Sequence, residues 1–200
     1  GLQRKFSPPA APGAPGGPEP PGGAALAWER RPREPLVVVA SLVDKAPNLA
    51  GLCRTSEVFN CRALCMANAK LTKDQAFQSI SVTAEKWLPI EEVPRCALHN
   101  HLLRLRRQGY ALVGVEQTHS SVPLDEYQFA PNTALVLGAE KEGIDAELLP
   151  LLDACVEIPQ SGQLRSLNVH VSGSLVIWEY VRQRRRIPPP PPDAAAVPPA

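Results

Sequence analysis

The sequence predicts a single α/β domain with a mainly parallel sheet and helices on both faces. Short apolar runs rich in β-branched residues alternate with segments of helical period, and strands joined through helices run parallel. Proline marks the limits of the domain, because residues 1–35 hold nine and residues 188–200 hold seven of the 23 Pro. Such stretches cannot form a hydrogen-bonded ladder, so both are expected to be disordered tails. The segment 36–187, about 152 residues, has the size of one domain with its own core.

The first half of this domain alternates strands with helices. Residues 36–42 form an apolar, β-branched run that is typical of a strand buried on both faces. A helix follows, with Asn48 at the position of an N-cap. The next expected elements are a strand over 63–66, a helix from about residue 72, a weaker strand over 88–90, and a helix from about residue 95 that carries Leu98, Leu102 and Leu105 on one face and ends at Gly109.

The second half continues the alternation. The expected elements are strands over 111–115, 133–137 and 155–158, a short helix over 145–152, and a long C-terminal helix. In that last helix Leu167, Val171, Leu175 and Trp178 recur at spacings of four, four and three. This spacing predicts a stripe that faces the core.

Charge and hydropathy exclude two classes of protein. Between the tails the chain has 16 basic and 16 acidic residues, so it is not a generic polyanion binder. RNA contacts would have to come from local patches such as 104–107 and 182–186, for which solvated helix faces are the alternative. No run approaches the roughly 20 apolar residues of a membrane helix, and the N-terminal segment has no apolar stretch of the signal-peptide type. A soluble, unsecreted protein is expected.

The cysteines and the first residue bear on where and how the protein occurs. The five Cys are an odd number and offer no disulfide framework, which predicts reduced thiols and an intracellular location, cytoplasmic or nuclear. The sequence starts at Gly1 rather than Met, which suggests a piece of a longer native chain.

Three segments that follow predicted strands stand out, because ligands of open parallel sheets bind at the carboxyl ends of the strands. Residues 48–54 read NLAGLCR, residues 138–144 read GAEKEGI, and residues 159–168 read PQSGQLRSLN. The second has the glycine spacing of a P-loop, but Ile144 and Asp145 replace its Lys and its Ser or Thr, and its glutamates repel phosphate. A phosphate-free or cationic adenosyl ligand fits this loop better, with a surface turn as the alternative.

Single residues in these segments have two interpretations each. Ser166 and Asn168 precede the last helix, where either side chain is an ordinary N-cap, but the pair could also line a ligand pocket. Arg54 is either a surface cation of a helix or a fork that holds a phosphate or a carboxylate. The residues alone leave these alternatives open.

In this order and at these separations, the three segments resemble the motifs of the SpoU/TrmH branch of the SPOUT methyltransferases, which are RNA 2′-O-ribose methyltransferases. The resemblance covers nearly all of residues 36–186. It implies an α/β fold with a deep C-terminal trefoil knot, S-adenosylmethionine as cofactor, and methyl transfer to a ribose 2′-hydroxyl that needs no metal. Further blocks at 82–93, 114–118 and 167–180 are very similar to the C-terminal domain of a large eukaryotic member. They imply tRNA as partner, with a D-loop guanosine as target, a homodimer, and additional N-terminal domains.

The resemblance also implies site residues. Cofactor contacts fall on Glu116, Gly138, Ile158 and Leu167, with Glu116 the weaker candidate. Catalytic or RNA-facing positions are Asn48, Arg54, Glu140, Ser166 and Asn168. We expect Arg54 to clamp a phosphate and to stabilise the developing alkoxide, because a guanidinium keeps its proton at neutral pH and is a poor base. Ser166 and Asn168 would orient the loop and the ribose, and Glu140 would fix its own loop or a partner subunit.

Two positions depart from the family's pattern. Asn60 stands where the family usually has Gly, and Ala139 stands where many members carry Asn or another amide. Neither departure removes a motif residue. Ala139 lacks a side-chain amide that could shape the cofactor loop, so we expect it to affect cofactor affinity more than mechanism.

Other candidate chemistry is weaker. Cys96, His99 and His101 lie on one predicted helix, but the two histidines point to opposite sides and a fourth ligand is missing, so no metal site is expected. Ordinary hydrogen bonding is favoured for His119 and His170. The alternative to an active methyltransferase is a catalytically inactive or partner-dependent RNA- or protein-binding module on the same fold.

Overall fold

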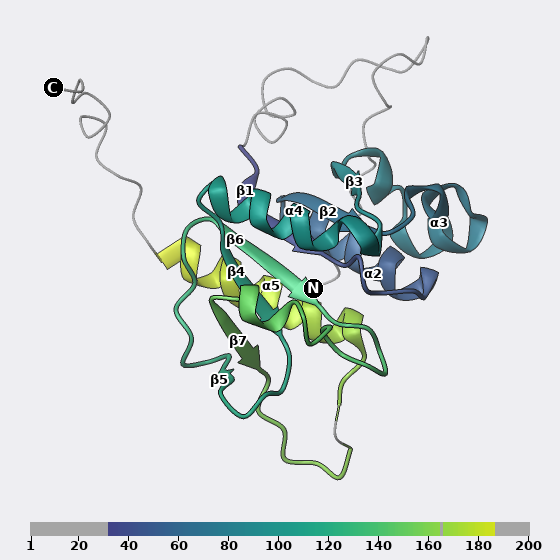
Figure 1. Cartoon of the computed structure of the whole chain (residues 1–200). Coiled ribbons are helices and arrows are strands. Elements are labelled where there is room, and N and C mark those ends of the chain that lie inside the picture. The colour runs from purple at the N-terminus through teal and green to yellow at the C-terminus, as the bar shows by residue number, and fades with distance from the viewer. Residues whose placement is uncertain (1–31, 165, 187–200) are drawn as a thin grey trace, which may run out of the picture. The chain divides into compact units, whose positions relative to one another are not determined.

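The computed structural model describes residues 32–164 and 166–186, so residues 1–31 and 187–200, which hold almost all of the two predicted tails, lie outside the described residues. The described part contains one seven-stranded sheet in the order β3-β2-β1-β6-β4-β7-β5, and every neighbouring pair is parallel. This confirms the predicted parallel sheet (Figure 1). The strands are β1 (Glu34–Val39), β2 (Cys61–Met66), β3 (Ile90–Glu92), β4 (Ala111–Val115), β5 (Val122–Pro123), β6 (Thr133–Leu137) and β7 (Ala154–Glu157).

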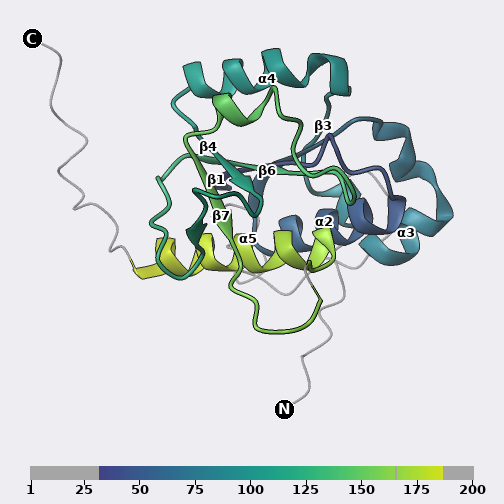
Figure 2. The same cartoon turned by 60° about the horizontal axis from the view of Figure 1, so that its bottom comes forward.

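Helices cover both faces of the sheet, as the alternation of strands and helices predicted. In Figure 2, α4 lies on one side of the sheet, and α2 and α5 lie on the other. The trefoil knot stays a prediction of the resemblance. The α-helices are α2 (Ala46–Val58), α3 (Gln75–Ser81), α4 (Arg95–Arg107) and α5 (Val169–Arg186), and the 3₁₀ turns are η1 (Ala69–Lys73), η2 (Ala84–Lys86) and η3 (Leu149–Leu151).

The central strand β1 is buried on both faces, which explains its continuous apolar sequence. Leu36 and Val38 pack into the core layer beneath α2 and α5, whereas Val37 and Val39 pack into the layer beneath α4. The α4 layer receives the predicted face of that helix, since Leu98, Leu102 and Leu105 are all buried. The two layers hold the strands rigidly, so the strand ends can position a site.

The apolar stripe on the last helix is wrong as a core prediction. Leu167 and the α5 residues Val171, Leu175 and Trp178 are 40–44% exposed. Two apolar faces run along this segment, and the tight approach at Gly173 decides which one turns inward, because a Cβ there would lie 2.6 Å from Leu52 Cδ2 on α2. The residues that do face the core are Val176, Ile177, Tyr180 and Val181.

Three local predictions also need correction. The α2 helix begins at Ala46, so Asn48 lies inside its first turn and is not the N-cap; Pro47 supports this earlier start because its fixed φ suits a first turn. The helix expected over 145–152 is only the 3₁₀ turn η3. The edge strand β5 has only two residues and lies in no apolar run, so the sequence did not predict it.

The limits of two elements have clear physical causes. The strand β1 starts at Glu34, inside the predicted tail, and Arg33 anchors this start by donating hydrogen bonds to the backbone oxygens of Cys61 (3.0 Å) and Trp87 (2.6 Å).

Asn60 has a left-handed φ of 56°, a conformation that Gly adopts freely and Asn tolerates better than most residues. Asn60 can therefore replace the family's Gly.

Two properties bear on the environment of the protein. Within the described residues no helix is long and apolar enough to cross a membrane. All five cysteines are free, and Cys53, Cys61 and Cys65 are buried.

Candidate active site

A pocket of about 560 Å³ opens at the carboxyl ends of β4, β6 and β7. The loops that follow these strands supply most of its wall, as expected for a parallel sheet. Its lining residues are Lys45, Val115, Glu116, Gln117, Leu137, Gly138, Ala139, Glu140, Lys141, Gly143, Val156, Glu157, Ile158, Gln160, Ser166, Leu167, Asn168, Val169 and Ser172. Three carboxylates and two lysines among them give the wall a net negative charge.

Three polar side chains from the three predicted segments form one hydrogen-bonded chain beside this pocket. The Asn48 side-chain amide donates to the Glu140 carboxylate, and the Asn168 amide donates to Asn48 Oδ1 at 3.0 Å. Lys45 forms an ion pair with the other Glu140 oxygen at 3.5 Å. Asn48 is buried, so satisfying both ends of its amide matters for stability. Segments 92 to 120 residues apart in sequence are thereby held together.

Asn168 has two roles at once. Its Oδ1 accepts a hydrogen bond from the backbone N–H of His170 at 2.9 Å, which is the N-cap interaction of α5. Its Nδ2 is the donor to Asn48. The cap and the pocket position were alternatives in the sequence, and the two ends of one amide satisfy both.

The loop after β6 is a tight turn that is stabilised by a hydrogen bond to Glu116, which follows β4. Ala139 and Gly143 exchange two backbone hydrogen bonds of 2.8 and 3.0 Å, and Gly143 has a φ of +72°. Glu116 accepts a hydrogen bond from the backbone N–H of Ile144 at 3.0 Å. A Cβ on Gly138 would lie 2.5 Å from the Gly143 backbone, so this turn requires glycine at 138. The Ala139 methyl is buried in the core layer beneath α4.

The structure brings most of the predicted site residues together. The four predicted cofactor positions, Glu116, Gly138, Ile158 and Leu167, all line the pocket. Of the predicted catalytic positions, Glu140, Ser166 and Asn168 line it, and Asn48 joins it through its hydrogen bonds. Arg54 is different: it is exposed on α2 and is not part of the pocket wall.

Sequence reasoning missed several polar residues of the pocket. Lys45 immediately precedes α2, and Gln117 follows β4 within the 114–118 block, but neither is a predicted site residue. Glu157 at the end of β7 accepts a hydrogen bond from Ser121 at 2.6 Å. It also lines an adjoining hollow of about 340 Å³ together with Gln117, Gln160 and Leu164. Their place in the loops after strands marks the region of the pocket, but it does not single out one polar residue.

A second contact joins the first and third segments on the outer side of the site. The imidazole of His170 lies over Gly51, where a Cβ would be 2.4 Å from the ring. Thr55 lies 3.3 Å from His170 Nε2 and 3.1 Å from the Ser174 hydroxyl. Burial lowers the pKa of His170, so the neutral ring is favoured here. α2 and α5 are therefore fixed against each other directly behind the polar chain.

Comparison with known proteins places this geometry in a family. The chain is 53% identical over 149 residues to the Mus musculus protein tRNA (guanosine(18)-2′-O)-methyltransferase TARBP1, covering 74% of this chain and 9% of that protein. The Aquifex aeolicus TrmH/SpoU tRNA modifying enzyme matches with a TM-score of 0.68 and 28% identity, covering 76% of this chain and 77% of that one.

A further solved structure shares the fold. It is the SpoU methyltransferase AviRb from Streptomyces viridochromogenes in complex with the cofactor AdoMet, with a TM-score of 0.64 and 24% identity, covering 76% of this chain and 57% of that one. The chain spans about a tenth of the length of the mouse relative. The model of the SpoU rRNA Methylase family matches residues 35–178. Because this match includes most of the chain and all three segments around the pocket, the chain belongs to the SpoU rRNA Methylase family.

Proposed function

We propose that this chain is the catalytic domain of an S-adenosylmethionine-dependent methyltransferase that acts on a ribose 2′-hydroxyl of tRNA, with a D-loop guanosine as target. The hydrogen-bonded chain of Asn48, Glu140 and Asn168 beside the strand-end pocket carries the proposal. Family membership and the tRNA-modifying relatives support the reaction class and the substrate. An intracellular location, cytoplasmic or nuclear, belongs to the same proposal.

The pocket suits the proposed cofactor in size and charge. Its volume of about 560 Å³ lies within the range of small-molecule and cofactor sites. S-adenosylmethionine, when bound, supplies a sulfonium-activated methyl group and carries no phosphate. Glu116, Glu140 and Glu157 on the wall favour a cationic ligand. The exposed backbone of Gly138, with the side chains of Ile158 and Leu167, would hold the adenosine.

The residues of this chain contribute mainly position. A methyl transfer requires an attacking oxygen in line with the methyl group at about 3 to 3.5 Å, so rigid placement supplies much of the rate. Asn168 and Ser166 on the pocket wall would orient the ribose, and Glu140 keeps the loop after β6 against Asn48. The wall therefore offers a preorganised polar surface on one side of the proposed reaction.

Arg54 does not line the pocket of its own chain, so its proposed role needs a partner molecule. Its exposed position on α2 leaves the guanidinium available to an RNA phosphate or to the site of a second copy of the chain. The fork geometry would stabilise the phosphate next to the reacting ribose and the developing negative charge. Substitution Arg54→Lys keeps the charge and loses the fork. We expect a loss of turnover of about tenfold or more with little change in cofactor affinity; near-normal turnover would contradict this role.

A homodimer is part of the proposal. Leu167, Val171, Leu175 and Trp178 form an exposed apolar stripe, and Phe59 at the end of α2 packs its ring 5.7 Å from that of Trp178. An apolar surface of this continuity is typical of a protein interface. A second copy is the proposed occupant because Arg54, on the neighbouring helix α2, lies outside the pocket of its own chain and could act at the pocket of a second copy.

Sedimentation tests the dimer. The chain is expected to sediment as a dimer, and Trp178→Glu is expected to shift it to a monomer because the charge would have to be desolvated in the interface. Val82→Glu is the matched control, because Val82 is also an exposed apolar residue, at 56%, but lies outside the stripe. A monomeric parent chain, or equal effects of the two variants, would contradict the assembly.

Methyl transfer to tRNA tests the activity itself. The chain is incubated with tRNA and methyl-labelled S-adenosylmethionine, and the tRNA is then mapped by nuclease digestion and mass analysis. A label on one D-loop guanosine ribose is expected. Asn168→Ala is expected to lower turnover by about tenfold or more, because it breaks both the bond to Asn48 and the cap of α5. Ser79→Ala, on the exposed side of α3, is the control.

Two other outcomes have defined meanings. A label on a base would overturn the reaction type. Cofactor binding by calorimetry without any transfer would favour the catalytically inactive or partner-dependent binding module.

A further inference from the structure

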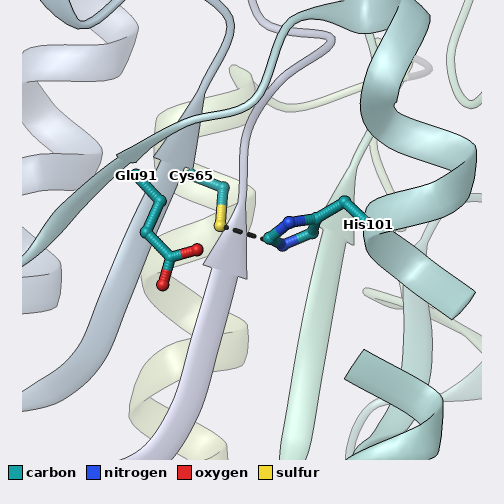
Figure 3. Close-up of side chains that lie close together, drawn as sticks. All are labelled: Cys65, Glu91 and His101. Carbon is teal, nitrogen blue, oxygen red and sulfur yellow. Dashed lines mark hydrogen bonds between the residues drawn. The ribbon is translucent and has the colours of Figure 1, made fainter. Parts of the chain in front are cut away.

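Three side chains with metal-binding atoms meet at the β2–β3 edge of the sheet, beneath α4. Figure 3 shows Cys65 from β2, Glu91 from β3 and His101 from α4 pointing toward one another. The thiol sulfur, one carboxylate oxygen and one imidazole nitrogen all lie within 4.8 Å of each other. Cys65 and His101 are 0% and 6% exposed, whereas Glu91 is open to solvent. None of the three lines the methyl-transfer pocket.

The distance between the two buried ligand atoms matches a tetrahedral metal centre. The Cys65 sulfur and His101 Nε2 form a hydrogen bond of 3.5 Å, drawn as the dashed line in Figure 3. A zinc ion with a Zn–S bond of about 2.3 Å and a Zn–N bond of about 2.0 to 2.1 Å places these atoms about 3.5 to 3.6 Å apart at the tetrahedral angle. Because Glu91 is exposed, its side chain can rotate to bring a carboxylate oxygen closer to the two buried ligand atoms.

The charges and ligand types favour the same ion. A thiolate and a carboxylate together neutralise a divalent cation, so the buried centre would carry no net charge. Sulfur and imidazole ligands select zinc over magnesium or calcium. We propose that Cys65, Glu91 and His101 bind one Zn²⁺ ion, with water as the fourth ligand.

Arg104 is a competing cation built into this cluster. Its guanidinium lies 2.8 Å from His101 Nδ1 and 3.4 Å from the Glu91 carboxylate. A metal ion on Nε2 leaves the ring proton on Nδ1, which then faces the guanidinium donor. Binding therefore requires Arg104 to leave, and its side chain, 55% exposed, can turn into solvent. The thiol proton is released to solvent in the same exchange.

The proposed centre would join α4 to the edge of the sheet. β3 is only three residues long, and it contributes Glu91 on one side of the junction while α4 contributes His101 on the other. An ion bound there would tie both elements to β2. Zinc is therefore expected to stabilise the folded chain without acting on the methyl group.

Cobalt is the probe for the test, because a thiolate bound to tetrahedral Co²⁺ gives a charge-transfer band and strong visible d–d bands. The whole chain is used in a Cys96→Ser background, which removes an exposed thiol that could bind metal adventitiously. One Co²⁺ per chain with these bands, displaced by Zn²⁺, is expected. Cys65→Val, which keeps a small buried side chain, is expected to abolish the thiolate band.

Two surface variants keep the test decisive if Cys65→Val folds poorly. Glu91→Gln removes one exposed carboxylate and is expected to weaken cobalt binding at least tenfold. Arg104→Gln removes the competing cation and is expected to tighten it about tenfold. No tetrahedral bands in the parent chain, bands that survive Cys65→Val, or no tightening by Arg104→Gln would each overturn the proposal.

Discussion

Replacing Gly138 with Ala is the sharpest perturbation of the pocket that does not touch a polar side chain. The added Cβ would lie 2.5 Å from the backbone carbon of Gly143 and 2.7 Å from the backbone nitrogen of Ile144. Backbone atoms cannot rotate away as a flexible side chain could. The turn after β6 must therefore open to admit one methyl group.

The size of the effect follows from what the opened turn loses. Ala139 and Gly143 exchange two backbone hydrogen bonds, and each contributes about 1 kcal/mol to stability. Losing both costs about 2 kcal/mol, which corresponds to a fall in melting temperature of about 4 to 8 °C for a chain of this size. If the same loop must close before the cofactor binds, its affinity falls by up to about thirtyfold.

Calorimetric titration with S-adenosylmethionine and thermal unfolding measure the two effects separately. Gly162→Ala is the matched control, because a Cβ at Gly162 would meet nothing within 4 Å. It lines the adjoining hollow and should change stability by less than about 0.5 kcal/mol. A Gly138→Ala variant that melts with the parent and binds the cofactor within about twofold of it would refute the proposed rigidity of the turn.

Two further predictions concern the helix that closes the domain. Tyr180 is fully buried and donates a hydrogen bond to the Pro131 carbonyl at 2.5 Å, so Tyr180→Phe should cost about 1 to 2 kcal/mol in a denaturant melt; an unchanged midpoint would show that the carbonyl finds another donor. Burial holds the pKa of His170 below its ordinary value of 6.5, so between these two values the unfolded chain binds a proton that the folded chain does not. The stability that neutral His170 contributes is present above about pH 6.5 and is lost as the pH falls below it. The variant His170→Gln should therefore show a weaker dependence of melting temperature on pH between about pH 7 and pH 5. Equal slopes for parent and variant would contradict the assignment.

Sequence patterns predicted the sheet better than the rotation of the helices on it. Strands such as β4 and β6 were located within their observed limits because a buried parallel strand is apolar at nearly every position. The last helix has two apolar faces, and periodicity alone could not tell the core from an exposed stripe. The contact of Gly173 with Leu52 decides between them, and this contact exists only in three dimensions.

Two short elements could not be predicted from the sequence for a related reason. β5 consists of two residues, and η3 is one turn, so neither has enough positions to show a period. α2 begins two residues before Asn48, because Asn48 is not its N-cap. Its side chain is instead used by Glu140 and Asn168, which the local sequence does not reveal.

The site was predictable to the extent that each residue lies in a segment after a strand. Gly138 and Asn168 could be named from such segments, but Lys45 and Gln117 could not, because a single polar residue at a strand end has no signature. The same limit applies to the cluster beneath α4. The sequence places His101 near Cys96 and His99 on its own helix, whereas its neighbour in the fold, Cys65, is 36 positions away.

If the proposed site is right, the polar chain beside the pocket would couple cofactor binding to catalysis. Glu140 belongs to the loop after β6, which would border the proposed adenosine, and Asn168 belongs to the helix start that would face the ribose. Asn48 connects them from a buried position, so removing either partner leaves an unsatisfied amide and shifts both loops. Substitutions at Glu140 and Asn168 should therefore be non-additive: the double variant should lose little more than the worse single one, because each alone already disconnects Asn48.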